Sequence, residues 1–204
     1  MSELLHYKLN TKADKLIYNA CSDLGIDPVN ANDIYINVYR LRDKLQAENN
    51  LSSIAVGTTG TITERLCEAA LISINSGYGK LPNDWKWVGD FYIESIPFNV
   101  IVSVKSFKAK ERLLSSGSGN YLSPTIGFGL FNDSREFRFN RVAKYPFRAF
   151  IAIYMPKDTY DQLDTDVQSL KNINNRPFIR KIEDFPEDLS SARDKKHKLD
   201  ITKF

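Results

Sequence analysis

Hydrophobic residues recur every three or four positions through the first 76 residues, a spacing that predicts α-helices. Three helices are expected, over Thr11–Leu24, from about Ala31 to Glu48, and from Thr61 to about Ser76. Gly25 ends the first helix, and Gly77 with Gly79 stops the third. Cys21 and Cys67 fall on the apolar faces, so both are expected to be buried thiols without a disulfide.

Between residues 89 and 107 the pattern changes to alternation, which predicts a β-hairpin. The reversal is expected at Ile96-Pro97-Phe98-Asn99, because proline suits the second position of a turn. Asp90 then lies opposite Lys105, and Tyr92 opposite Ser103. The apolar face carries Phe91, Ile93, Val100, Val102 and Val104. The other, solvated face carries Asp90, Tyr92, Glu94, Ile101, Ser103 and Lys105. This face presents a carboxylate and an amine about 5 Å apart at Cβ.

The later part of the chain predicts more strands and a helix. Ser134–Val142 alternates like a strand, and Phe147–Met155 is apolar on both faces, as a central buried strand is. A helix is expected over about Lys157–Lys171, followed from Asn172 by a polar tail whose end forms a surface or partly disordered arm. The predicted fold is α/β or α+β, a mixed β-sheet with a central hairpin flanked by helices.

The length of 204 residues predicts a single domain, with a helical part over 1–55, a core over 57–171 and the tail over 172–204. Hydrophobic residues make up 42% and charged residues 26%, as in ordinary globular proteins. No apolar run approaches the roughly 20 residues that span a bilayer, and the first ten residues lack the pattern of a signal peptide. A cytoplasmic protein without membrane contact is expected.

The net charge of +3 is unevenly spread, because residues 101–150 hold 9 basic and 3 acidic side chains. Such a block suits a polyanionic partner, although a solvated surface would give the same composition. Within it, the Gly/Ser-rich loop at Ser115–Asn120 is either a connector or a segment that orders on DNA. The candidate DNA-binding residues are Lys108, Lys110, Arg112, Ser116, Ser118 and Asn120.

Several chemistries are disfavoured by the residues present. The chain has two histidines, His6 and His197, so His-based triads and zinc sites are not expected. No Gly-x-Gly-x-x-Gly motif follows a predicted strand, so no nucleotide cofactor is expected.

The solvated face of the hairpin carries groups that suit phosphodiester hydrolysis. That reaction calls for a divalent metal, oxygen ligands that hold it and a cation beside the reacting phosphate. Asp90 supplies a carboxylate, the Val104 carbonyl a second oxygen and Lys105 the cation. Glu64, on the third predicted helix, is the candidate for the second carboxylate.

These residues resemble the pattern of the PD-(D/E)xK nuclease superfamily, and within it the type II restriction endonucleases. There a helical Glu precedes a hairpin, an Asp opens one strand, and an acid-x-Lys triplet lies on the next. The matching segments, within about residues 57–110, are GTITERL, VGDFYIE and VSVKSF. The later strand FRAFIAIYM with its helix is similar to the rest of the common core. Gly89 stands where the family often has Pro, and Ser103 where Asp or Glu is usual.

The resemblance implies a restriction-endonuclease-like core and a Mg²⁺-dependent enzyme that cuts a short palindromic site in double-stranded DNA. Asp90, Glu64 and the Val104 carbonyl would hold the metal, Lys105 would orient the attacking water, and Ser103 would help through a hydrogen bond. The missing acid at Ser103 makes one ion more plausible than two. A palindrome calls for a homodimer, for which the N-terminal helices are candidates. A repair or junction-resolving nuclease of the same superfamily is the alternative.

Each candidate residue also has an ordinary structural explanation. Glu64 completes a capping box with Thr61, in which case Glu68 is the reserve ligand. Asp84 rivals Asp90, although an Asp in this position is typical of turns. Asp90 and Lys105 can form a simple salt bridge. The chain would then be a nucleic-acid-binding protein without catalysis, or an interaction domain.

Overall fold

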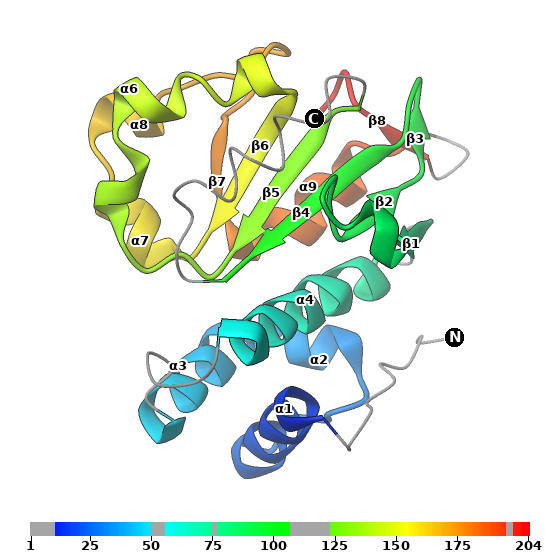
Figure 1. Ribbon diagram of the computed structural model, residues 1–204, viewed down its shortest axis with the longest axis vertical. Coiled ribbons are helices and arrows are strands. Elements are labelled where there is room, and N and C mark those ends of the chain that lie inside the picture. Colours follow the sequence, from blue (N-terminus) through cyan, green and yellow to red (C-terminus); the bar gives the residue numbers. More distant parts are fainter. Residues whose placement is uncertain (1–10, 50–55, 75–76, 107–122, 195–197) are drawn as a thin grey trace. The chain divides into compact units, whose positions relative to one another are not determined.

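The computed structural model describes residues 11–49, 56–74, 77–106, 123–194 and 198–204. The chain divides into two compact units, Met1–Asn75 and Ser76–Phe204. The first unit is helical, and the second is built on a mixed β-sheet with helices, so the class is α+β (Figure 1). In the described ranges, no helix combines the length and the apolar character needed to cross a membrane.

The first unit packs helices of unequal length. Helix α1 contacts α3 and α4, and α2 also lies against α4. The bounds are α1 Lys12–Leu24, α2 Ala31–Ile36, α3 Val38–Asn49 and α4 Val56–Ser73. The predicted inward residues Ile34, Val38, Leu41 and Leu45 are all buried, as are the free thiols of Cys21 and Cys67. The hydrophobic periodicity therefore identified the core face of this unit.

The helix boundaries agree only in part with those predicted from the sequence. Thr11 caps α1 by accepting the Asp14 N–H, and Gly25 closes it in the left-handed conformation at φ 67°, as expected. The second predicted helix is interrupted at Asn37, which separates α2 from α3. Helix α4 begins at Val56, so the predicted start at Thr61 was wrong.

The second unit contains a six-stranded sheet in the order β1-β2-β4-β5-β6-β7. Strands β1, β2 and β4 are antiparallel, whereas β4, β5, β6 and β7 run parallel. Their bounds are β1 Tyr78–Lys80, β2 Phe91–Ile93, β4 Val100–Lys105, β5 Thr125–Gly129, β6 Phe150–Met155 and β7 Ile179–Lys181. A separate parallel pair joins β3 Ser95–Ile96 to β8 Leu199–Asp200.

Strand β6 is buried on both faces, as its continuous apolar run predicted, but it begins at Phe150 rather than at Phe147, which is exposed in a 3₁₀ turn. On one face Tyr154 packs against Phe185 of α9, with ring centroids 4.7 Å apart. On the other face Ile153 and Met155 join a cluster that includes residues of α6 and α8. Figure 1 shows α9 behind the sheet and α6, α7 and α8 beside its β6–β7 end. The bounds are α6 Phe139–Val142, α7 Lys157–Asp161, α8 Thr165–Gln168 and α9 Phe185–Ser191.

The secondary structure predicted for the segments on either side of β6 was wrong. Ser134–Val142 is not a strand: it forms the 3₁₀ turn η2 Ser134–Phe137 and then α6. The side chain of Asp133 accepts the Arg135 N–H at 3.0 Å, which starts a turn where the alternation predicted an extended chain. The helix predicted over 157–171 is likewise broken into α7 and α8.

Strand β5 was not predicted, because glycine weakens a strand signal. Gly129 is nevertheless required where β5 passes β4. A Cβ there would lie 2.7 Å from the main-chain oxygen of Lys105 and 2.5 Å from the Phe131 ring. The glycine thus marks a close approach of two strands rather than a loop.

The segment after Asn172 is folded rather than an irregular arm, with β7, α9, β8 and a buried Phe204. Two further short 3₁₀ turns, η3 Pro146–Arg148 and η4 Ile182–Asp184, occur in this half of the chain.

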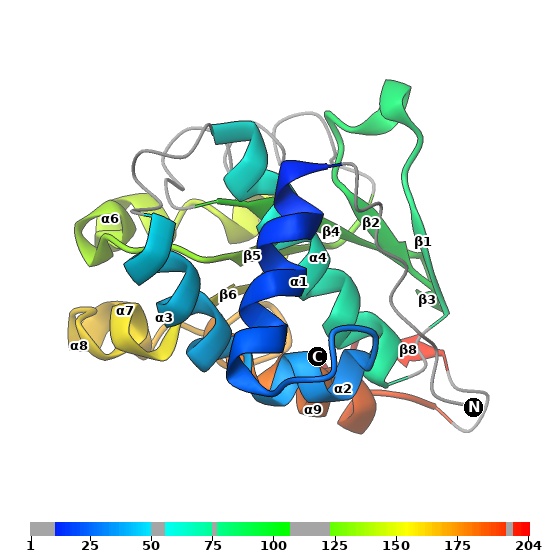
Figure 2. The same ribbon diagram turned by 90° about the horizontal axis from the view of Figure 1, so that it is seen from below.

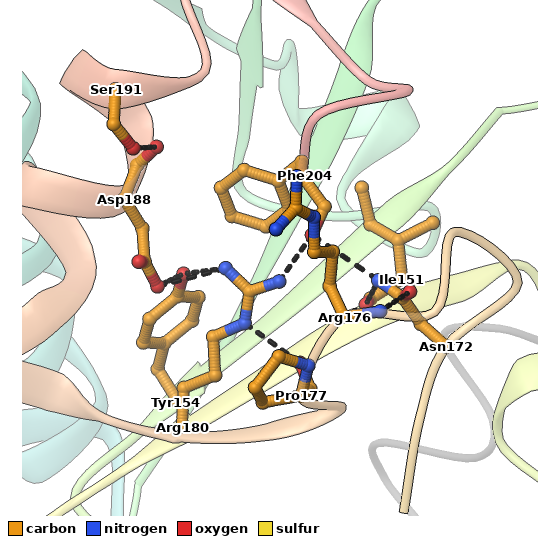
Figure 3. A network of polar contacts seen from close by, with 9 residues as sticks. All are labelled: Ile151, Tyr154, Asn172, Arg176, Pro177, Arg180, Asp188, Ser191 and Phe204. Carbon is orange, nitrogen blue, oxygen red and sulfur yellow. Dashed lines mark hydrogen bonds and ion pairs between the residues drawn. The ribbon is translucent and has the colours of Figure 1, made fainter.

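Arg180 on β7 holds this segment together (Figure 3). Its guanidinium donates to Asp188 at 2.8 Å, to the Tyr154 hydroxyl at 3.2 Å, to the Pro177 carbonyl at 2.8 Å and to a main-chain oxygen of Phe204. The Arg180 side chain is only 9% exposed, and it lies over the Phe204 ring at 4.5 Å. Four hydrogen bonds and the contact with the Phe204 ring therefore surround this buried cation.

Arg180→Met should lower the free energy of unfolding by about 3 kcal/mol, because Asp188 and the Phe204 oxygen would lose their buried cation. Urea unfolding followed by circular dichroism measures this change. Arg135→Met is the matched control, since that guanidinium is 80% exposed beside Asp133 and its loss should change stability little. Equal unfolding midpoints for the two variants would contradict a structural role for Arg180.

Candidate active site

Asp90 lies directly before β2 and Lys105 is the last residue of β4, so two neighbouring strands carry the candidate pair. Their pairing differs from the predicted register. Tyr92 lies opposite Ile101 rather than Ser103, a slip of two residues. The turn predicted at residues 96–99 is not a tight hairpin, because Ser95–Ile96 turns away to pair with β8. A slip of two residues preserves the alternation, so each side chain keeps its predicted face.

Gly89 explains how Asp90 still reaches the end of β4. A Cβ at Gly89 would lie 2.3 Å from the Ile101 side chain and 3.0 Å from the Val102 carbonyl oxygen, so only glycine fits there. The chain therefore approaches β4 closely enough for the Asp90 N–H to donate to that oxygen at 2.8 Å. The family's proline would not fit this approach, since its Cβ would meet the Ile101 side chain and the Val102 carbonyl oxygen.

Asp90 and Lys105 meet around the peptide groups of Val104. The Val104 N–H donates to Asp90 Oδ2 at 2.7 Å, and Lys105 Nζ donates to the Val104 carbonyl at 3.0 Å. Lys105 Nζ lies 3.9 Å from Asp90 Oδ2. The two side chains are 16% and 12% exposed, so the pair is largely shielded but retains access to solvent. Among the described residues, Asp90 Oδ1 makes no hydrogen bond.

Burial raises the pKa of Asp90 above its ordinary value of 3.8. The Lys105 ammonium, the Val104 N–H and the Lys86 ammonium act in the opposite direction without cancelling the effect. The protein thus holds a carboxyl group whose charged form is poorly solvated. A raised pKa beside a specific cation is typical of functional sites, although structural ion pairs show it too.

Ser103 lies two residues before Lys105 and is fully buried. Its Oγ has no hydrogen-bond partner among the described residues. The hydrogen bond through which Ser103 was expected to assist the reaction stays a prediction. Ile101 on the same face is only 7% exposed, so the β4 side of the face predicted to be solvated is buried except at Lys105.

Glu64, the predicted second carboxylate, is a residue of α4 in the first unit. That Glu64 and Asp90 bind the same cation stays a prediction. The competing capping box was wrong, because α4 begins five residues before Thr61. Glu68, the reserve, is 8% exposed and binds Arg65 at 2.8 Å, and Arg65 also binds Asp14 at 2.9 Å. Glu68 therefore serves a buried ion network of the helical unit.

Of the remaining candidate site residues, one lies within the described ranges and six lie outside them. Asp84 lies in the exposed 3₁₀ turn η1 Asn83–Trp85, outside the paired strands. The six predicted DNA-binding residues fall outside the residues that the structure describes; they are Lys108, Lys110, Arg112, Ser116, Ser118 and Asn120. The sequence analysis overlooked Lys86, whose charge acts on Asp90, and the two tryptophans beside it.

The oxygen atoms near Asp90 are of the kind that binds a hard divalent cation, since Mg²⁺ accepts a carboxylate oxygen and a main-chain carbonyl as ligands. They are few: within the described ranges, no group of three or more His, Cys, Asp or Glu side chains is placed to hold a metal. A site here would need Glu64 or oxygens from water and substrate. Comparison with protein-family models, curated proteins and solved structures found no match to this chain.

Ser103→Ala should raise the free energy of unfolding by about 1 kcal/mol, because it removes a buried hydroxyl without a partner. Thr159→Val is a control of opposite sign: its Oγ1 is buried and donates to the Phe131 carbonyl at 2.6 Å. That variant should lose about 1 kcal/mol. Chemical denaturation of both variants tests the pair, and a destabilised Ser103→Ala would show that the hydroxyl has a partner after all.

Asp90→Asn should leave the protein as stable as wild type, or more stable, at pH 7. The folded-state pKa of Asp90 is raised, so ionisation weakens the wild type as pH climbs from about 4 through that pKa. The advantage of the Asn variant should therefore grow from pH 4 to pH 7 and then level off. Melting temperatures of both proteins across this range measure it. A variant that melts lower at pH 7 would favour the simple salt bridge.

Proposed function

We propose that this chain is a metal-dependent endonuclease that hydrolyses phosphodiester bonds of double-stranded DNA. One observation carries the proposal: Asp90 and Lys105 come from different strands and converge on the Val104 main chain, at 2.7 Å and 3.0 Å. A carboxylate, a carbonyl oxygen and an ammonium group in one partly shielded place are what that reaction needs from a protein.

The cofactor proposed for this site is Mg²⁺, with Asp90, the Val104 carbonyl and Glu64 as the residues that would hold it. When bound, such a cation polarises a phosphate and lowers the pKa of a coordinated water. The order of elements supports the proposal, since the Glu64 helix precedes the Asp90 and Lys105 strands as in the nucleases that the sequence resembles.

Lys105 has the clearest role among the residues of the chain. Its ammonium touches the Val104 carbonyl and is 16% exposed, so it can turn toward a water or a phosphate oxygen without leaving the site. There it would orient the attacking water and stabilise negative charge as it develops on the phosphate. Asp90, anchored by the Val104 N–H, would present its other oxygen to the site.

The finer assignment is a type II restriction enzyme that acts as a homodimer on a palindromic site, with a repair or junction-resolving nuclease as the alternative. A twofold target is matched by a twofold protein. The N-terminal helices are the proposed dimer contact, and the basic segment with Lys108, Lys110 and Arg112 is the proposed contact with DNA.

A nucleic-acid-binding protein without catalysis is the second candidate. The scarcity of carboxylates around Asp90 in the described residues favours it. Titration calorimetry with Mg²⁺ separates the two, because only the enzyme should show a saturable metal site that Asp90→Asn removes.

Wild-type protein should convert supercoiled plasmid to nicked and linear DNA in Mg²⁺ but not in EDTA. Lys105→Met should reduce the rate at least about 100-fold, a loss comparable to removal of one electrostatic stabiliser from an active site. DNA binding in Ca²⁺, measured by fluorescence anisotropy, should persist because the substitution leaves the other basic residues in place.

Lys144→Met is the matched control, since Lys144 is an exposed lysine of the same unit outside the site. It should cut like wild type after identical purification. Equal cutting by wild type and Lys105→Met would mean that the activity belongs to a contaminant or to other residues, and the proposal would then fail.

A further inference from the structure

The connection between β1 and β2 is a loop made of hydrogen-bonded turns. Its turns are closed by hydrogen bonds from the Trp85 N–H to the Pro82 carbonyl and from the Val88 N–H to the Trp85 carbonyl, both at 2.9 Å. The 3₁₀ turn η1 at its tip projects beyond β1 and β2, as the green turn at the upper right of Figure 2 shows. The loop therefore holds its side chains out from the sheet in a defined place.

Two tryptophans occupy this loop, and both are exposed. Trp85 is 56% and Trp87 is 59% exposed. Tryptophan is largely buried in most proteins, and an indole N–H usually finds a partner when it is covered. Within the part of the chain that the structure describes, neither indole donates a hydrogen bond. Two large rings exposed on a hydrogen-bonded turn have their apolar faces available to a ligand.

The loop begins and ends at the candidate active site. The Leu81 N–H donates to the main-chain oxygen of Asp90 at 3.0 Å, which ties the start of the loop to its end. Lys86, between the two tryptophans in the sequence, is exposed on the same loop. The loop that carries the indoles is thus anchored at Asp90, the residue that pairs with Lys105.

The surroundings of the rings indicate which chemistry they would bind. The loop residues Pro82, Asn83, Asp84 and Lys86 are all exposed, so the indoles stand apart in a polar loop rather than forming one apolar patch. A protein partner would favour a continuous apolar patch. Separate aromatic faces with a lysine between them match a strand of nucleic acid, whose bases stack on rings while its phosphates meet cations.

We propose that Trp85 and Trp87 stack on unpaired bases of DNA beside the phosphate at the Asp90–Lys105 site. Bases inside a duplex are already stacked on each other, so the rings need a frayed end, a flap or a branch. The placement of that phosphate rests on the proposed function, whereas the stacking does not. The substrate class that follows is a duplex with unpaired bases beside the point of cleavage, which favours a repair or junction-resolving nuclease over the palindromic restriction site.

The chain offers a direct probe, because Trp85 and Trp87 are its two tryptophans. Intrinsic fluorescence is titrated in EDTA with an oligothymidylate of about 12 nucleotides, within the site sizes of stacking proteins. We expect strong quenching, and quenching also in Trp85→Phe and Trp87→Phe, each of which leaves one reporter. A duplex closed by hairpin loops at both ends, with the loops made of an abasic linker, should quench far less.

Affinity supplies the second measurement. Trp85→Ala and Trp87→Ala should each weaken oligothymidylate binding about 5- to 100-fold by fluorescence anisotropy. Phe147→Ala is the control, since Phe147 is 85% exposed elsewhere in the same unit and its loss should leave affinity unchanged. Unaltered melting temperatures would show that all three variants are folded, as expected for exposed residues.

The stacking proposal and the proposed nuclease fail in different ways. Absence of quenching in EDTA, or equal affinity of wild type and both Trp→Ala variants, overturns the stacking proposal even if plasmid is cut in Mg²⁺. Quenching that persists in Lys105→Met and in a wild type that cuts no DNA supports stacking and removes the nuclease. A fluorescence change with lipid vesicles but none with the oligothymidylate would overturn the stacking proposal in favour of a membrane surface.

Discussion

The candidate site depends on one close approach, that of residues 89–90 to strand β4. Gly89 has no Cβ, and the space that a Cβ would fill is taken by Ile101 and the Val102 carbonyl. Because the chain comes this near, Asp90 makes two hydrogen bonds to β4, one from its N–H and one to its carboxylate. The carboxylate is thereby fixed beside Lys105 even though the strands pair two residues out of the expected register.

Buried polar groups in the second unit differ in how well the fold satisfies them. Arg180 is buried with its donors matched by Asp188, Tyr154 and main-chain oxygens, and it joins β7, α9 and the segment of Phe204. Such a network is typical of structure. Ser103 is buried and its hydroxyl finds no partner in the described part of the chain, and burial raises the pKa of Asp90. Groups that a fold leaves poorly satisfied are more often found where a ligand completes them.

The proposed site and the tryptophan loop form one continuous feature of the chain. The loop leaves β1, exposes Trp85 and Trp87, and returns at Gly89 to the strand that Asp90 precedes. A carboxylate–lysine pair suits a phosphate, and exposed rings suit bases, so both point to the same kind of ligand. Both features lie within the described residues and are independent of Lys108, Lys110 and Arg112, the basic residues predicted to contact DNA, which fall outside that range.

Local patterns in the sequence determined the helical faces, the caps of α1, the burial of β6, and the faces on which Asp90 and Lys105 lie. These follow from the periods of the helix and the strand and from the chemistry of Thr and Gly, which act over a few residues. Only the tertiary structure decided the hairpin register, because Ser95–Ile96 pairs with β8, some hundred residues away in the chain. The same holds for β5, in which Gly129 is explained by the closeness of Lys105 and Phe131, and for the folding of the last segment around Arg180. Contacts between distant segments set these features, and no local period records them.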